Sequence, residues 1–305
     1  TPARQSRASA TNSAATLGYA VNVSNGTLTV NRRDITPSFV AQDRVYNGTT
    51  SASVNGNLAN TVRGDLLTLD QTATFDNRNA GTGKTVNISG ISLGGVDAAN
   101  YRLVLSGTPN TPVDANTAIT TTATIHRADL LITLPTTPGA RSKVYDRSTL
   151  LATDASSFVA GGGTQVFTHD RLVTGGATAN FSDFNAGTGK TITLAGVTVH
   201  DDITNAASQN YNLRFDTITD GVITPRPLTV TLNSAITKTY DGTTAAWGAV
   251  LGDFAFGGDG LVQGDTVGTL PTLAFNNANV SRDGNGNVLS NRGVTPSNIG
   301  IVGAF

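Results

Sequence analysis

Four lysines are the residues of this chain whose type and spacing come nearest to known chemistry. Lys84 and Lys190 each end an identical Gly-Thr-Gly-Lys phrase, within Asn79–Thr85 and Asn185–Thr191. A glycine-rich loop ending in lysine binds phosphate when a helix follows it, because backbone amides at the helix N-terminus then face the phosphate. Here alternating strand patterns follow both lysines, and both copies lack the first glycine of the phosphate motif. The sequence therefore predicts a glycine-containing hairpin turn at both places.

The other two lysines, Lys143 and Lys238, are each separated by one residue from a Tyr-Asp pair, and Arg44 has the equivalent place before Tyr46. Such regular placement favours a structural use, in which the aliphatic stem is buried and a nearby Asp or carbonyl holds the charged end. An isopeptide cross-link from lysine to Asn or Asp is the alternative. It usually needs a neighbouring catalytic acid, and the sequence contains no Glu.

Few other groups are suited to catalysis or metal binding. The three histidines occupy non-equivalent places, and there is no cysteine to act as a nucleophile or soft ligand. The sequence from Asp283 imitates the start of a calcium loop but lacks the closing Glu, and a glycine-rich acidic cluster contains Asp253, Asp259 and Asp265. We keep these four aspartates as weak calcium candidates. No other cofactor and no enzymatic activity are expected.

The lysines belong to a long sequence repeat. Its signature tyrosines are Tyr46, Tyr145 and Tyr240, which lie 99 and 95 positions apart. Each is followed by a Gly-Asp or His-Asp pair and then a Phe, and the first two repeats close with Asn-Tyr at Tyr101 and Tyr211. A period of about 95–99 residues is that of a small domain and exceeds the 20–50 residues of a solenoid coil.

Arginines that precede strand-like runs place the boundaries between these domains near residues 33, 127 and 226. We therefore expect the tail of a preceding repeat at 1–33, complete repeat domains at 34–127 and 128–226, and an incomplete third at 227–305. The third repeat lacks a closing Asn-Tyr. Either the chain is a window cut from a longer array, or N-terminal strands of one chain complete the unfinished sheet of another.

Composition predicts the fold class. All 21 acidic residues are Asp and there is no Met, so good helix formers are scarce, while Thr, Val, Asn and Gly abound. Runs such as Leu228–Leu232 alternate apolar residues with Thr, which is typical of half-buried strands. We predict a mainly β protein, an elongated tandem array of small β-sandwich or β-grasp-like domains. The Tyr-Asp-Gly-Thr-Thr signature is predicted to be a tight turn with its tyrosine ring in the core.

Taken together, the motifs Lys-x-Tyr-Asp-Gly-Thr-Thr, Gly-Asp, Phe-Asp or Phe-Asn, Asn-Ala-Gly-x-Gly-Lys and Asn-Tyr-x-Leu resemble a known repeat family. They are similar to the YDG and related MBG-type repeats of very large bacterial adhesins, which are filamentous-haemagglutinin-like exoproteins secreted through an outer-membrane partner. The resemblance covers nearly the whole chain. It implies a secreted, cell-surface stalk or binding segment in attachment to cells, surfaces or a biofilm matrix.

Two functional alternatives remain open. The chain is either an adhesin stalk that mainly provides reach, or a glycan-binding module in which an aromatic such as Trp247 contacts the sugar. Expected partners are a glycan or protein of a cell surface or matrix, neighbouring repeats, and other copies of the chain. With 20 basic against 21 acidic residues, the basic excess that nucleic-acid binding needs is missing. No apolar run approaches the 18 residues of a membrane span.

Overall fold

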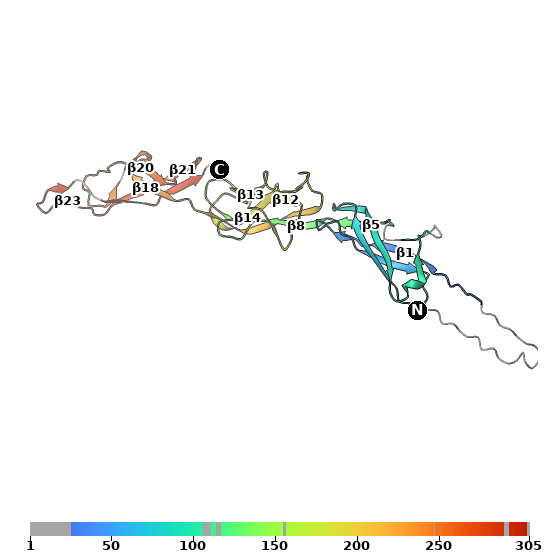
Figure 1. Cartoon of the computed structure of the whole chain (residues 1–305). Coiled ribbons are helices and arrows are strands. Elements are labelled where there is room, and N and C mark those ends of the chain that lie inside the picture. Colours follow the sequence, from blue (N-terminus) through green and yellow to red (C-terminus); the bar gives the residue numbers. More distant parts are fainter. Residues whose placement is uncertain are drawn as a thin grey trace, which may run out of the picture. The chain divides into compact units, whose positions relative to one another are not determined.

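Strands dominate the computed structural model of this chain, which describes residues 26–105, 111–113, 117–154, 157–246, 248–289 and 293–303. Figure 1 shows these strands along the chain, from β1 to β23. The only helical elements in the described ranges are two single 3-10 turns, η2 (Ala98–Asn100) and η3 (Leu251–Asp253). This confirms the predicted mainly β class. Residues 1–25 of the predicted tail at 1–33 lie outside the described residues. Trp247 also lies outside them.

The chain divides into two compact units. The first unit comprises Thr1–Asp43, Thr50–Asn77 and Gly83–Thr124, and the second comprises Arg44–Thr49, Arg78–Thr82 and Ile125–Phe305. Two short segments of the first repeat therefore belong to the same unit as the second and third repeats. The domain boundaries expected from the sequence stay a prediction.

The first repeat contains two sheets. The three-stranded sheet has the order β3-β1-β6, in which β1 pairs antiparallel with β3 and parallel with β6. The four-stranded sheet has the order β2-β7-β5-β4. The bounds of these strands are β1 Arg33–Ala41, β2 Arg44–Val45, β3 Val54–Ala59, β4 Thr68–Phe75, β5 Gly81–Gly94, β6 Tyr101–Leu103 and β7 Ile119–His126.

The second repeat has the same plan. A three-stranded sheet, β11-β8-β16, again has a central strand with one antiparallel and one parallel neighbour. A five-stranded sheet, β10-β13-β14-β17-β9, and the pair β12-β15 complete it. The strands are β8 Ala128–Thr133, β9 Ser142–Val144, β10 Leu150–Leu151, β11 Val159–Gly161, β12 Asp170–Val173, β13 Thr178–Phe181, β14 Gly187–Ala195, β15 Thr198–Asp201, β16 Tyr211–Phe215 and β17 Thr217–Thr224.

In the third repeat, the first sheet is reduced to the antiparallel pair β18-β20. The order β19-β22-β25 and the pairs β21-β26 and β23-β24 form the rest of what is described there. Its strands are β18 Leu228–Leu232, β19 Ala245–Ala246, β20 Phe254–Gly258, β21 Asp265–Thr269, β22 Thr272–Phe275, β23 Ser281–Arg282, β24 Val288–Leu289, β25 Val294–Ser297 and β26 Gly300–Gly303.

The cores come from the alternating pattern of the sequence. Strand β8 buries Ala128, Leu130 and Ile132, while the residues between them are more exposed. Strand β14 buries Ile192 and Leu194 in the same way. Because successive side chains of a strand point to opposite faces, the buried positions of each strand line one face of its sheet. The half-buried sheets expected from the Thr-alternating runs are therefore present.

The Gly-Thr-Gly-Lys phrase is not the hairpin turn that the sequence predicts. The bend precedes it, and the phrase itself opens strands β5 and β14. Gly83 and Gly189 have φ of 61° and 68°, a conformation that glycine adopts without strain. The lysine that ends each phrase places its ammonium group against an aspartate of the preceding bend. Lys84 Nζ lies 3.1 Å from Asp76 Oδ1, and Lys190 Nζ bonds Asp183.

None of the helical turns in the described ranges has the length and apolar character that crossing a membrane requires.

Candidate functional site

The aspartate of each Gly-Asp or His-Asp pair is the hydrogen-bond acceptor for tyrosines. Within the first repeat the closing Tyr101 donates its hydroxyl to Asp65, and within the second Tyr211 Oη lies 3.0 Å from Asp170 Oδ2. The same two hydroxyls accept the amides of Val62 and Phe167, each at 2.9 Å. Each closing tyrosine therefore secures the loop that carries its own aspartate.

The first two signature tyrosines, Tyr46 and Tyr145, reach the aspartate of the following repeat. Tyr46 donates its hydroxyl to Asp170 Oδ2, the oxygen that also accepts from Tyr211. Tyr145 Oη lies 2.9 Å from Asp265 Oδ2 and 3.2 Å from Oδ1. All of these residues lie in the second compact unit. We call the Tyr46–Asp170 contact the first junction and the Tyr145–Asp265 contact the second junction.

Aromatic packing buries the first junction. Only 1% of the Tyr46 surface is exposed. Its ring meets those of Phe167 and Tyr211 edge to face, at centroid distances of 5.7 Å and 5.4 Å. Such edge-to-face pairs add about 0.5–1.5 kcal/mol each to the gain from burial alone. The tyrosine of one repeat is thus a core residue of the next.

The signature turn holds each tyrosine in place. The residue after the Asn or Asp has positive φ in every copy: 78° at Gly48, 64° at Arg147 and 73° at Gly242. The Asn or Asp side chain accepts the amide two residues further on, as when Thr243 N lies 2.9 Å from Asp241 Oδ1. This hydrogen bond closes the turn and fixes the direction in which the preceding tyrosine leaves it.

The basic residue before each signature tyrosine stabilises the same turn. Lys143 Nζ donates to the carbonyls of Ser148 and Leu150 at 3.0 Å and 2.7 Å. Lys238 repeats the arrangement, and its bond, together with those from Thr243, lowers the pKa of Asp241 to about 2. These lysines lie where the structural interpretation of the sequence places them.

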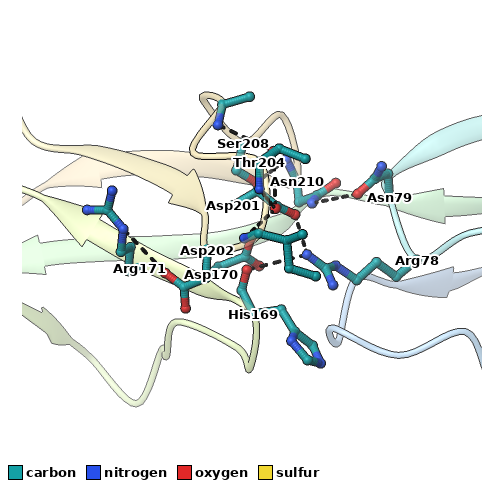
Figure 2. A network of polar contacts seen from close by, with 12 residues as sticks. Arg78, Asn79, His169, Asp170, Arg171, Asp201, Asp202, Thr204, Ser208 and Asn210 are labelled. Atoms are coloured by element: carbon teal, nitrogen blue, oxygen red, sulfur yellow. Dashed lines mark hydrogen bonds and ion pairs between the residues drawn. The ribbon is translucent and has the colours of Figure 1, made fainter.

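A polar network surrounds the first junction (Figure 2). Arg78 bonds the carboxylate of Asp201 and the carbonyl of His169. Asn210, which is 4% exposed, accepts the amide of Ala80 at 2.8 Å and donates to Asn79 Oδ1 at 3.2 Å. The first NAGTGKT phrase therefore supplies contacts to the closing Asn-Tyr of the next repeat.

The second junction uses different side chains at the same positions. Arg147 Nε lies 3.4 Å from Asp265 Oδ1, whereas the first junction has Gly48 in the place of this arginine. Phe184 replaces Arg78, and Gly303 of β26 pairs with Asp265 as Asp201 of β15 pairs with Asp170. The Arg78–Asp201 ion pair of the first junction therefore has no counterpart at these positions, and the second junction has the Arg147–Asp265 ion pair instead.

Glycines alternate across the two junctions to make room. Gly48 lies so close to the next repeat that an added Cβ would be 3.1 Å from the Cβ of Phe167 and 3.1 Å from the carbonyl oxygen of Thr168. At the second junction the bulky Arg147 lies against Gly264, where an added Cβ would be 1.7 Å from its guanidinium. His169 has the place of Gly264 in the first junction, with φ of 73° against 97°. Each junction therefore has its own steric fit.

Burial and the neighbouring carboxylates change the acidity of the tyrosines. Desolvation, followed by the bond to Asp170, raises the pKa of Tyr46 to about 12. Desolvation also raises the pKa of Tyr211 and of Tyr145. In the first repeat the hydrogen bond to Asp65 is the main reason that the pKa of Tyr101 is raised. All four hydroxyls are therefore kept protonated as donors.

The remaining residues singled out from the sequence lie apart from the junctions, with the exception of Asp265. Tyr240 is 60% exposed. The calcium candidates have other roles: Asp253 and Asp283 accept backbone amides of their own turns, and the Asp259 carbonyl accepts from Arg226. Among the residues that the structure describes, no three acidic or histidine side chains gather in a metal-binding group.

Sequence reasoning missed the partner of the signature tyrosine. It placed the ring in the core of its own repeat, but the hydroxyl bonds an aspartate 124 residues away at the first junction and 120 at the second. The signal was the regular recurrence of the Gly-Asp or His-Asp pair. The separations of 124 and 120 residues both exceed one repeat period, so each of these contacts joins two repeats.

Comparison with known families agrees with this internal repetition. Three segments of the chain, residues 31–112, 131–219 and 224–304, match the family model described as the YDG domain. The chain belongs to the YDG domain family. No curated protein and no solved structure matches it.

The matched YDG segments share one plan in their junction residues. The tyrosine and the acidic or amide residue of the Tyr-Asp-Gly signature have separate tasks, since the tyrosine bonds the next YDG repeat while Asn47, Asp146 and Asp241 close the local turn. In this chain the tyrosine of the Tyr-Asp-Gly motif therefore connects one repeat to the next at both junctions.

Alkaline pH is expected to weaken the first junction. The pKa of Tyr46 is raised to about 12 in the folded chain, against about 10 for an unfolded tyrosine. The contribution is therefore complete below pH 10 and is lost as the pH rises toward 12. We expect the urea midpoint of wild type to fall over this interval more steeply than that of Tyr46→Phe. Equal slopes for the two proteins would contradict the assignment.

Proposed function

We propose that this chain is a structural segment of an extracellular bacterial adhesin, in which YDG repeats joined end to end hold an attachment site away from the cell. The observation that carries the proposal is the hydrogen bond between a signature tyrosine and the aspartate of the next repeat, made twice, by the buried Tyr46 and the half-buried Tyr145. A repeat that buries its neighbour's tyrosine resists bending at that point, which is useful in a stalk and of no evident use to an enzyme.

The resemblance to filamentous-haemagglutinin-like exoproteins supports a finer form of the proposal. The chain would be secreted through an outer-membrane partner and act at the cell surface or in a biofilm matrix. Its partners would be a glycan or protein there and the neighbouring repeats. The absence of cysteine from the sequence is compatible with an oxidising compartment. We propose no catalytic role.

Solution scattering tests the stalk. A compact globule of this length would have a radius of gyration of about 19 Å. We expect a clearly larger radius of gyration for wild type. For Tyr46→Ala we expect a scattering profile typical of a more flexible chain, because the first junction then loses its buried ring. The exposed Tyr240→Ala is the matched control and should leave the profile unchanged. A wild-type radius near the compact value would exclude a stalk.

A carbohydrate array separates the stalk from a glycan-binding module. The stalk proposal expects no specific glycan to be retained by the chain. A specific hit that disappears in Trp247→Ala would show that sugar recognition resides in this segment, and the purely structural role would then be abandoned.

A further inference from the structure

The first signature turn differs from the other two in its side-chain acceptor. Asn47 stands where the second and third repeats have Asp146 and Asp241. Each of the three side chains accepts the backbone amide two residues further on, and in the first repeat Thr49 N lies 3.1 Å from Asn47 Oδ1. The same turn therefore has a carboxylate in two copies and a neutral amide in one.

The carboxylates of the later turns form ion pairs with the basic residue of the signature. Lys238 Nζ lies 2.6 Å from Asp241 Oδ1, and the second repeat has the same pair. In the first repeat Arg44 has this place and donates to Asn47 Oδ1. Hydrogen bonds to a charged partner on both sides are stronger than those to a neutral acceptor. Arg44 thus lacks the carboxylate that its counterparts bond.

Three donors converge on the side-chain oxygen of Asn47. They are the guanidinium of Arg44, the amide of Thr49 at 3.1 Å and the hydroxyl of Thr49 at 2.9 Å. Donors aimed at a carbonyl oxygen stabilise the negative charge that develops there when a nucleophile attacks the carbon. The side chain of Asn47 is exposed, so water has access to it. These contacts activate Asn47 Cγ as an electrophile.

The nucleophile is the backbone nitrogen of the next residue. Gly48 has no Cβ to hinder an approach to this nitrogen. Its amide has no hydrogen-bond partner among the residues that the structure describes. The second repeat has Arg147 at this position, so the combination of an amide acceptor with glycine occurs in the first signature alone.

We propose that Asn47 is a self-modifying residue, which its own turn converts to aspartate without an enzyme. Gly48 N forms a bond to Asn47 Cγ, the bond from Cγ to Nδ2 breaks, and the proton of the Gly48 amide leaves with Nδ2 as ammonia. Water then adds to Cγ of the resulting succinimide, the bond from Cγ to Gly48 N breaks, and this nitrogen regains a proton. The net change is hydrolysis of the side-chain amide to a carboxylate and an ammonium ion.

The same donors select the carbon at which the succinimide opens. Opening at Cγ gives ordinary aspartate, whereas opening at the main-chain carbonyl carbon gives isoaspartate, which inserts a methylene group into the backbone. Arg44 and Thr49 polarise the carbonyl of Cγ. Gly48 also lies against Thr168, whose carbonyl oxygen would be 3.1 Å from an added Cβ, so a longer backbone does not fit without a shift. Aspartate is therefore the expected main product.

Modification gives the first turn the charge pattern of the other two. An aspartate at position 47 pairs with Arg44 as Asp241 pairs with Lys238. This turn supports Tyr46, whose ring packs in the second repeat. The first junction of an aged chain is therefore firmer than that of a newly made one. The inference does not depend on the adhesin role.

Peptide mapping by mass spectrometry tests the proposal on the folded 305-residue chain, which is incubated at neutral pH. Two other Asn-Gly pairs are internal controls. The glycine after Asn55 lies in strand β3, which pairs with β1, and the glycine after Asn285 donates its amide to the carbonyl of Asp283 at 3.0 Å. We expect Asn47 to convert about tenfold faster than either control, because three donors polarise its amide.

Variants assign the reaction to the turn. Arg44→Gln removes the charged donor and should slow conversion of Asn47 about tenfold, while conversion of Asn285 stays unchanged. Thr49→Val removes the hydroxyl donor, keeps the shape of the side chain, and should slow conversion by a smaller factor. Hydrogen exchange at Phe167 shows whether the first junction stays intact in each variant. Unfolding wild type in urea should bring the three Asn-Gly pairs to similar rates.

The modified chain has its own reference protein. Asn47→Asp carries the expected product, and fragmentation that separates aspartate from isoaspartate compares it with aged wild type. The amide of Thr49 should exchange more slowly in Asn47→Asp than in freshly purified wild type, because a carboxylate is the stronger acceptor. Aged wild type should approach the exchange rate of the variant.

Any of three results would overturn the proposal. The first is an Asn47 that stays intact while Asn285 converts. The second is an equal rate at Asn47 in wild type and Arg44→Gln with the first junction intact, which would leave the turn no part in the reaction. The third is isoaspartate as the main product, which would contradict the direction of ring opening that Arg44 and Thr49 impose.

Discussion

Replacing Tyr46 by Ala is expected to lower the local free energy of opening at the first junction by about 3 to 5 kcal/mol, the range for large buried aromatics. The ring is 1% exposed and contacts Phe167 and Tyr211, so the substitution leaves a cavity in the second repeat as well as an acceptor with one donor fewer. Amide hydrogen exchange at Phe167, whose N–H donates to Tyr211 Oη, measures the change.

Two variants make the test of Tyr46 specific. Tyr240→Ala removes the same side chain at an exposed position, and we expect a change within about 0.5 kcal/mol. Tyr46→Phe keeps the ring and deletes only the hydroxyl, so its effect should lie between those of the other two. Exchange at Phe167 that is identical in wild type and Tyr46→Ala would mean that the two repeats do not share a core.

Replacing Asn210 by Ala is expected to cost about 1 to 3 kcal/mol, the penalty for leaving the partly buried amide of Ala80 unpaired. Asn210 is 4% exposed and is the acceptor for the amide of Ala80. We expect faster hydrogen exchange at the Ala80 amide, which belongs to the other repeat. A substitution in the second repeat would then be detected in the first NAGTGKT phrase.

The adjacent strand offers a matched control for Asn210. Asn212 lies two residues further along, and its side chain bonds Asp129 in an exposed position. Asn212→Ala should leave exchange at Ala80 unchanged. If both substitutions accelerate exchange equally, the effect arises from strand β16 as a whole and the specific bond to Ala80 has no separate importance.

The two junctions differ in ways that would keep the repeats in order. A charged pair, Arg78 with Asp201, belongs to the first, whereas Phe184 and Gly303 have these positions at the second. Gly48 and Arg147 are likewise exchanged between them. A repeat inserted at the wrong place would meet a buried arginine without its aspartate or a side chain where glycine is needed, and both are costly.

Much of the fold follows from local sequence. The Thr-alternating runs, the glycines of the tight turns and the absence of Glu and Met predicted sheets joined by short turns, and strands with a single buried face are what the structure has. The prediction for Gly-Thr-Gly-Lys was wrong about position. A positive φ at Gly83 and Gly189 occurs within a strand here, and the sequence does not distinguish a bulge from a turn.

The sequence by itself determined that this chain is a β-rich array, and that tyrosine, aspartate and lysine recur in it at fixed places. Only the tertiary structure decided that Tyr46 and Tyr145 serve the following repeat. The physical reason is that a local sequence pattern shows which residues alternate between the two faces of a strand and which form turns. The hydrogen-bond partner of a hydroxyl more than a hundred residues away depends instead on how whole sheets pack. At the first junction, burial of the Tyr46 ring in the second repeat is what makes the repeated motif a contact between repeats.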